Sequence, residues 1–300
     1  MSEKWRFAGF VDMLFLTVLQ SLWSERGRGE LSMDRKTVLV CGASSGLGKA
    51  AAEALAAAGH TVYAGARSFA RGAEAPALCR AVPLDVTDAG QVRLAVEKII
   101  GEQGRLDVLV CCAASFTMAP LEELPPDTFL DMMQVNVVGM ARCVQAALPF
   151  MRQSGKGHIL LFSSLNGLFS IPFQGAYSAT KHAVEAYGEA LSQETARFGI
   201  RVTVVEPGDC RGGSSRYRLS HIRPDSPYAE AFEHGTNKIH RDESEGLPPE
   251  CVGRAVARCV GRRRPPARLM VASPLQRMAA VLHVILPRRL FNRFIAAYYR

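Results

Sequence analysis

Tyr177 and Lys181 lie four residues apart and form the first pair in this sequence that could do chemistry. Apolar residues continue at helical spacing after them, at Val184, Tyr187 and Leu191, which predicts a helix with the phenol and the ammonium on neighbouring turns of one face. A free tyrosine titrates near pH ~10, and an adjacent ammonium favours the phenolate. The pair therefore suits proton exchange with an alcohol oxygen near neutral pH.

Ser164 stands thirteen residues before Tyr177. The aliphatic run from His158 to Phe162 predicts a buried strand, and Ser164 follows that strand just before a turn-forming Asn166-Gly167. A hydroxyl at the carboxyl end of a strand could hydrogen-bond the same substrate oxygen as the tyrosine. Taken alone, Tyr-x-x-x-Lys fits a plain amphipathic helix with a solvated lysine better than a catalytic site. The serine and the glycine loop upstream reverse that preference.

A glycine-rich loop connects a short apolar strand, Thr37 to Cys41, to a helical pattern that stops at Gly59. A second strand, Thr61 to Gly65, completes a βαβ unit, which is the context that such a loop needs. Glycines at this turn let the backbone approach a pyrophosphate, whose charge is met by amides and by the helix dipole. The loop contributes the candidate cofactor-binding residues Gly42, Ser44, Ser45, Gly46, Leu47 and Gly48.

The glycine loop, Ser164, Tyr177 and Lys181 together resemble the classical short-chain dehydrogenase/reductase family in order and spacing, over about Lys36 to Ala272. The amino-acid sequence around the tyrosine is similar to that of the hydroxysteroid and retinol dehydrogenase branch. The resemblance implies a single α/β catalytic domain with a doubly wound, Rossmann-like parallel sheet. It makes Tyr177 the acid-base residue, Lys181 its tuner and a ribose ligand, and Ser164 the group that polarises the carbonyl.

The same resemblance assigns further positions. Asn136 becomes a fourth catalytic residue, which bends its helix and supports a proton-relay water near the lysine. A mid-helix asparagine flanked by valines, inside a helix predicted over Pro126 to Arg152, is expected to have a specific partner. The implied cofactor contacts are Asp85 and Val86 at the adenine side, and Ala113, Tyr177, Lys181, Pro207 and Gly208.

Several positions depart from the family pattern. Cys41 stands where threonine is usual, Cys112 where asparagine is usual, Ala114 where glycine is usual, and Gly212 near a usual threonine. Most of these changes remove a hydrogen-bonding group, and Ala114 adds a methyl group beside the nicotinamide. They leave cofactor affinity open while the acid-base residues are intact.

The end of the second strand is expected to select the cofactor. A carboxylate there would bind both ribose hydroxyls of NAD, whereas a guanidinium binds the extra phosphate of NADP. Ala66 occupies the acidic site, and Arg67 follows it. The sequence therefore favours NADP(H) over NAD(H), with a solvent-facing arginine as the alternative.

Composition is that of an ordinary globular protein, with 48% hydrophobic and 21% charged residues in 300. None of the eight cysteines forms a spaced C-x-x-C metal pair, and no metal site is expected. Buried reduced thiols in a cytoplasmic protein are favoured over a disulfide framework.

Residues 1–33 precede the family core. Phe7, Phe10, Leu14, Val18 and Leu22 repeat at helical spacing, which predicts a hydrophobic helix. Its run of about seventeen apolar residues is at the lower limit for crossing a bilayer. An interfacial helix, or one packed on the enzyme or on a partner, is favoured over a true span.

Two segments follow the sixth strand, Ile200 to Val205. Residues 209–247 lose clear periodicity and are expected to form a mobile substrate lid, with at most a short helix over Tyr228 to His234. Residues 34–273 form the catalytic domain, and 274–300 a basic, amphipathic tail broken at Pro287. Eleven arginines and no Lys, Asp or Glu lie between Cys251 and Arg300.

Such a tail suits an anionic membrane surface or an acidic carrier partner, and packing on the catalytic core is the competing interpretation. No nucleic-acid recognition motif accompanies the charge. Family resemblance adds a homo-oligomer built through the helices that bear Asn136 and Tyr177.

These observations predict an NADP(H)-dependent oxidoreductase that interconverts a ketone and a secondary alcohol on a lipophilic or polycyclic substrate. It is expected to be cytoplasmic, with peripheral attachment to a membrane as the alternative. Two alternatives stay open at this point. The same fold could perform dehydration, cyclisation or epimerisation, or the chain could be a cofactor-binding scaffold with impaired turnover.

Overall fold

A seven-stranded parallel sheet forms the centre of the molecule. The structure is a computed structural model that describes residues 34–211 and 219–300; the hydrophobic segment 1–33 and Gly212 lie outside the described residues. The strand order is β3-β2-β1-β4-β6-β7-β9. The strands are β1 (Thr37–Cys41), β2 (Thr61–Ala66), β3 (Arg80–Pro83), β4 (Val108–Cys111), β6 (Gly157–Phe162), β7 (Ile200–Pro207) and β9 (Arg268–Val271). The order reverses between β1 and β4, which confirms the predicted doubly wound sheet.

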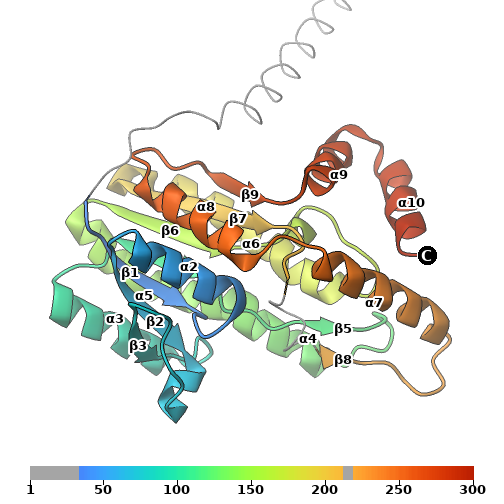
Figure 1. Ribbon diagram of the computed structural model, residues 1–300, viewed down its shortest axis with the longest axis horizontal. Helices are drawn as coiled ribbons and strands as arrows, with labels where there is room; N and C mark the ends of the chain where they lie inside the picture. Colours follow the sequence, from blue (N-terminus) through green and yellow to red (C-terminus); the bar gives the residue numbers. More distant parts are fainter. Residues whose placement is uncertain (1–33, 212–218) are drawn as a thin grey trace, which may run out of the picture.

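Helices cover both faces of this sheet (Figure 1). One face carries α3 (Ala89–Gln103), α5 (Met140–Ser154) and α6 (Gly175–Thr195), and the other carries α2 (Gly46–Ala57) and α8 (Pro249–Gly261). Each layer has its own core of aliphatic side chains. Strands that are buried on both faces have continuous apolar sequences, and for this reason they could be predicted from the sequence.

The helix predicted over Pro126 to Arg152 is interrupted. It consists of α4 (Pro126–Met133), a π-helical turn η2 (Gln134–Gly139) and α5. Gly139 closes the turn against the loop after β3, where an added Cβ would lie 2.7 Å from a methyl carbon of Val86. The wide turn therefore sits directly above the carboxyl end of the sheet, and it contains Asn136.

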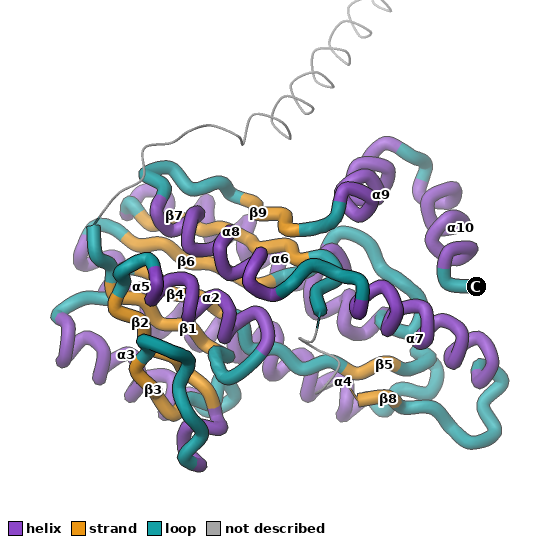
Figure 2. The backbone as a smooth tube through the Cα atoms, in the orientation of Figure 1, coloured by secondary structure: helices purple, strands orange, loops and turns teal. Residues whose placement is uncertain are grey.

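The segment expected to be a largely irregular lid contains a full helix, which corrects that prediction. Helix α7 runs from Ala229 to Ser244, far beyond the expected short helix. Its buried positions include Phe232, Gly235 and Ile239, a helical spacing in which glycine and polar residues dilute the apolar signal. A small parallel pair, β5 (Thr117–Met118) and β8 (Leu219–Ser220), lies beside α7, outside the main sheet (Figure 2).

The C-terminal arm, residues 274–300, consists of α9 (Pro274–Ile285) and α10 (Arg288–Tyr298), with the predicted break at Pro287. A capping box between Ser273 and Gln276 starts α9. Phe291, only 3% exposed, packs on Phe169 in the loop after β6, with ring centroids 5.3 Å apart. The arm therefore touches the catalytic core along one side.

Short 3-10 turns complete the described chain at η1 (Arg67–Arg71), η3 (Leu165–Gly167) and η4 (Ala196–Phe198). All eight cysteines are free thiols. Among the helices of residues 34–211 and 219–300, none has the length and apolar character needed to span a bilayer.

Candidate active site

Helix α6 holds Tyr177 and Lys181 on one face, as the spacing predicts. The ammonium nitrogen of Lys181 lies 5.5 Å from the ring centroid of Tyr177. It donates a hydrogen bond of 2.8 Å to the carbonyl oxygen of Phe162, the last residue of β6. The carboxyl end of a central strand thus fixes the lysine that faces the tyrosine.

Lys181 is buried, with 3% of its surface exposed. Burial lowers the pKa of its ammonium to about 8, against a smaller opposing effect of the Glu185 carboxylate, which favours the charged form. Glu185 lies one turn further along α6, and its carboxylate pairs with Arg268 at 3.3 Å. The lysine therefore remains charged at neutral pH, although it holds its proton less firmly than an exposed lysine.

Ser164 caps η3 at the end of β6. Its Oγ accepts a hydrogen bond of 3.2 Å from the backbone N–H of Asn166, which leaves the hydroxyl proton available to a ligand. The neighbouring Ser163 turns the other way and donates to the carbonyl of Lys181 at 3.3 Å. Of the two serines, Ser164 is thus the one in place to polarise a substrate carbonyl.

Asn136 has the specific partners that its position requires. Its Oδ1 accepts from the N–H of Ser115 at 2.7 Å, and its Nδ2 donates to the carbonyl of Ser115 at 2.8 Å. The same Nδ2 donates to Oγ1 of Thr180 at 3.0 Å, and that hydroxyl donates to the carbonyl of Tyr177 at 2.8 Å. Asn136 therefore ties the loop after β4 to the turn of α6 that bears the tyrosine.

The glycine loop packs closely against the backbone at the end of β4. Gly42 has a left-handed φ of +86°, and a Cβ there would lie 2.5 Å from the amide nitrogen of Ala113. A Cβ on Gly48 would lie 2.2 Å from the carbonyl oxygen of Gly42. Ser45 at the N-cap of α2 makes no side-chain cap. The first-turn amides therefore keep the polarity that suits a pyrophosphate, and the residues present fit a dinucleotide.

The loop after β2 carries the residues expected to select the cofactor. Ala66 is buried at the end of the strand, and Arg67 is exposed at the start of η1. Beside them, Oγ of Ser68 is buried without a hydrogen-bond partner among the described residues. A buried hydroxyl without a partner is destabilising unless a ligand satisfies it. Sequence reasoning missed this serine, because a lone hydroxyl has no periodic signal.

At the adenine side, the carboxylate of Asp85 accepts hydrogen bonds from Thr87, at 2.9 Å from the backbone N–H and 2.7 Å from the hydroxyl. Val86 is buried under Gly139. On the other side, Pro207 ends β7 and Gly208 donates to the carbonyl of Val271 at 2.9 Å. These four residues all lie at the carboxyl ends of strands, around the glycine loop.

Three of the departures from the family pattern, Cys41, Cys112 and Ala114, lie at the same edge. Cys41 and Cys111 are paired in register on β1 and β4 and are buried. Burial raises the pKa of the Cys112 thiol to about 12, so this thiol stays neutral. Its sulfur would lie 3.4 Å from a Cβ on Gly48. Ala114 is exposed. The thiols thus fill space beneath the glycine loop where the family has polar groups.

An apolar wall stands beside Tyr177. Phe116 lies 4.3 Å from the tyrosine, centroid to centroid. The wall consists of buried Phe116, Met118, Phe232 and Ile239, with partly buried Ile171, Phe173, Tyr177, Ile222 and Tyr299. Its members come from β5, α7, the loop after β6 and the end of α10, so only the fold brings them together. Tyr299 was not predicted to lie here, whereas Phe232 and Ile239 belong to the segment that was expected to form the substrate lid.

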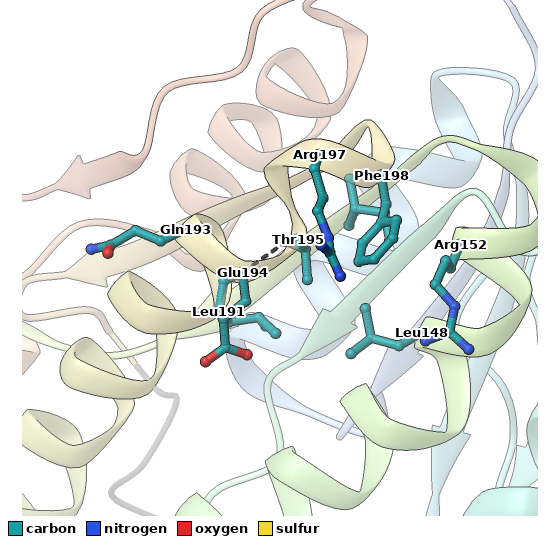
Figure 3. Close-up of a pocket in the computed structure, with 9 residues that line it drawn as sticks. Leu148, Arg152, Leu191, Gln193, Glu194, Thr195, Arg197 and Phe198 are labelled. Carbon is teal, nitrogen blue, oxygen red and sulfur yellow. Dashed lines mark hydrogen bonds between the residues drawn. The ribbon is translucent and has the colours of Figure 1, made fainter.

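A hollow between α5 and α6 lies away from this chemistry (Figure 3). It is lined at the carboxyl ends of the two helices by residues such as Leu148, Arg152, Glu194 and Phe198. At 1.5 Å per residue, this end of α6 is about 25 Å from Tyr177. Near the candidate site and elsewhere in residues 34–211 and 219–300, no cluster of His, Cys, Asp or Glu has the arrangement of a metal site.

The doubly wound parallel sheet, with the glycine loop at its carboxyl edge, defines a Rossmann-like fold. A model of the short chain dehydrogenase family matches residues 36–220. The chain therefore belongs to the short-chain dehydrogenase/reductase family.

The chain is similar to the 3-ketodihydrosphingosine reductase of Bacteroides thetaiotaomicron, with 36% identity over 89% of this chain and 99% of that protein. It is similar to human 17-beta-hydroxysteroid dehydrogenase type 1, with 37% identity over 59% of this chain and 57% of that protein. A solved short-chain dehydrogenase from Streptomyces avermitilis matches with a TM-score of 0.76 and 32% identity, over 88% and 97% of the two chains. Solved structures of the same fold include complexes with NADP and with NAD.

Proposed function

We propose that this protein interconverts a lipophilic ketone and a secondary alcohol with NADP(H). The observation that carries the proposal is the placement of Tyr177 beside the buried ammonium of Lys181, which β6 fixes through the carbonyl of Phe162. The family supplies the class of reaction. The apolar wall beside the tyrosine supports the class of substrate, and Arg67 and Ser68 support the choice of cofactor.

The residues that would hold the cofactor are the glycine loop at its pyrophosphate and Lys181 at the nicotinamide ribose. Arg67 and Ser68 would hold the phosphate that distinguishes NADP from NAD, because a guanidinium and a buried hydroxyl without a partner both suit that group. When bound, this cofactor supplies or accepts the hydride.

The chain's own residues perform the proton chemistry. In the direction of reduction, the hydroxyl of Ser164 donates a hydrogen bond to the substrate carbonyl. The phenol of Tyr177 gives its proton to the same oxygen as the carbonyl carbon takes up the hydride, so that C=O becomes CH–OH. The Lys181 ammonium stabilises the resulting phenolate, and Asn136 holds the helix turn in place through Thr180.

The apolar wall favours a lipophilic substrate. Phe116, Phe232 and Tyr299 offer hydrocarbon and aromatic surface beside the tyrosine, where a polar substrate would lose hydration without compensation. The similarity to a reductase named for a keto lipid and to a hydroxysteroid dehydrogenase points the same way. Eight free cysteines support a reducing compartment, and we propose the cytoplasm.

The test is Tyr177→Phe, which removes the proton donor and keeps the ring. Turnover on a panel of lipophilic ketones should fall about 100- to 10,000-fold, while NADPH binding, followed by fluorescence, is retained. Tyr187→Phe on the same helix is the matched control and should leave turnover unchanged. Wild-type turnover in Tyr177→Phe would refute the role of Tyr177. Cofactor binding without turnover in the wild-type protein would refute the oxidoreductase proposal and favour a scaffold or a non-redox reaction.

A further inference from the structure

The C-terminal arm carries an exposed apolar surface that the proposed reaction does not use. Seven of the thirteen exposed large hydrophobic residues in the described ranges lie on it: Leu275, Met278, Val284, Ile285, Leu290, Phe294 and Tyr298. Exposed apolar residues scattered singly are ordinary, whereas a gathering of them marks an interaction surface. In Figure 1 the arm stands out from the body of the sheet, next to the carboxyl end of β9.

Helix α10 shows how this surface is organised. Phe291, Ile295 and Tyr299 follow one another at a spacing of four and face the protein. The adjacent stripe, Leu290 and Phe294, has the same spacing and faces outward, while Tyr298, one turn further along, contacts α7. A helix that buried only one face would place polar residues on the next stripe. Here two neighbouring stripes are apolar. One packs on the protein, and the other is available to a second apolar environment outside it.

Arginines border the outward stripe. Arg288, Arg289 and Arg293 are exposed on α10, and residues 274–300 contain no Asp, Glu or Lys. Val284 and Ile285, at the elbow just before them, are 76% and 50% exposed. Aliphatic and aromatic side chains beside guanidinium groups match the boundary between acyl chains and anionic headgroups.

We propose that the C-terminal arm docks on an anionic lipid bilayer surface, with the elbow and the outward stripe of α10 inserted at the headgroup boundary. A second copy of this chain fits the surface less well. A symmetric contact through this face would place Arg288, Arg289 and Arg293 of both copies in one interface. The arm provides no carboxylate to neutralise them.

The docked arm would also reach the candidate site. The inward stripe ends at Tyr299, which belongs to the apolar wall beside Tyr177. Lys238 of α7 donates to the hydroxyl of Tyr298 at 2.8 Å, and that hydroxyl donates to Asp242 at 3.1 Å. The bilayer surface would thus be separated from the apolar wall by helix α10 alone. This consequence for substrate entry rests on the proposed function, whereas the docking itself does not.

The experiment measures binding of the full chain to vesicles of phosphatidylcholine, with and without phosphatidylserine, by co-sedimentation. The variants are Leu290→Ser/Phe294→Ser and, separately, Arg288→Gln/Arg289→Gln/Arg293→Gln. Because each arginine near an anionic surface contributes about fivefold, the triple variant should bind the anionic vesicles about 100-fold less tightly. The serine variant should lose binding to both kinds of vesicle.

The matched controls are Leu94→Ser/Leu130→Ser, at exposed leucines elsewhere, and Arg71→Gln/Arg201→Gln/Arg211→Gln. They should bind like the wild type, and the segment 1–33 is kept in every variant. Circular dichroism and thermal unfolding establish that the arm variants are folded. Wild-type vesicle binding in the arm variants would overturn the proposal. The proposal would also be overturned if the full wild-type chain did not bind anionic vesicles. It would be overturned as well if the arm substitutions converted a dimer to a monomer in sedimentation while vesicle binding was unchanged. None of these outcomes depends on enzyme turnover.

Discussion

At the scale of single residues, the site combines a strongly buried charge with groups that lack partners. Lys181 is buried, yet the carbonyl of Phe162 accepts a hydrogen bond from it, and its pKa of about 8 keeps it charged at neutral pH. The Oγ of Ser68, by contrast, is buried and has no hydrogen-bond partner among the described residues, and Arg67 beside it is exposed. The first arrangement suits the proposed proton chemistry, and the second suits the phosphate of the proposed cofactor.

The choice of cofactor can be tested at Arg67. Arg67→Ala should weaken NADPH binding by about 1.5–3 kcal/mol, the contribution of a charged hydrogen bond, and should change NADH binding little. Titration of both cofactors by fluorescence measures the difference. Arg71→Ala, on the same 3-10 turn and equally exposed, is the control and should alter neither affinity. Equal losses for NADPH and NADH would show that Arg67 does not contact the phosphate.

At the scale of elements, two local irregularities build the site. The π-helical turn η2 offsets α5 from α4 and brings Asn136 to the loop after β4 and to Thr180. The glycine loop brings β1 and the start of α2 into contact with the end of β4, closer than any side chain would allow. Both irregularities occur at the carboxyl edge of the sheet, where doubly wound folds bind their ligands.

The glycine loop can be tested by adding a single methyl group. Gly48→Ala places a Cβ 2.2 Å from the carbonyl oxygen of Gly42. The clash should reduce the free energy of unfolding by about 1–3 kcal/mol and weaken cofactor binding. Gly101→Ala, in α3 with no atom within 4 Å of the new Cβ, should instead stabilise the protein by about 0.5–1 kcal/mol. Urea unfolding with cofactor titration measures both variants. Stability and affinity unchanged in Gly48→Ala would contradict the close approach.

At the scale of the whole molecule, the C-terminal arm joins parts that are distant in the sequence. Gln276 of α9 donates to Asp209 after β7 at 2.6 Å. Phe291 of α10 packs on Phe169 after β6, and the hydroxyl of Tyr298 accepts a hydrogen bond from Lys238 of α7. One arm therefore spans three of the segments that surround the candidate site. The expected homo-oligomer through the helices of Asn136 and Tyr177 stays a prediction, for which sedimentation velocity is the direct measurement.

The attachment of the arm depends most on Phe291. Phe291→Ala removes a side chain that is only 3% exposed, a change that typically costs about 3–5 kcal/mol. We expect local detachment of the arm, seen as faster amide exchange over residues 288–298. The KM for lipophilic ketones should rise relative to the wild type, and the KM for small ketones should change less. Phe294→Ala, at a side chain that is 58% exposed, is the control. If both variants exchanged alike, the arm would not be held through the inward stripe.

The sequence alone determined the sheet and the placement of Tyr177 beside Lys181, because both have local signals. Continuous apolar runs mark strands buried on two faces, and a spacing of four puts Tyr177 and Lys181 on one helix face. Tertiary structure alone decided the partners of Asn136, the unsatisfied hydroxyl of Ser68 and the apolar wall, which contains both Phe116 and Tyr299. Helix α7 was also underestimated, because Gly235 and Thr236 occupy its buried face and carry little hydrophobic signal. Contacts between residues far apart in the chain have no periodicity, so only the folded chain reveals them.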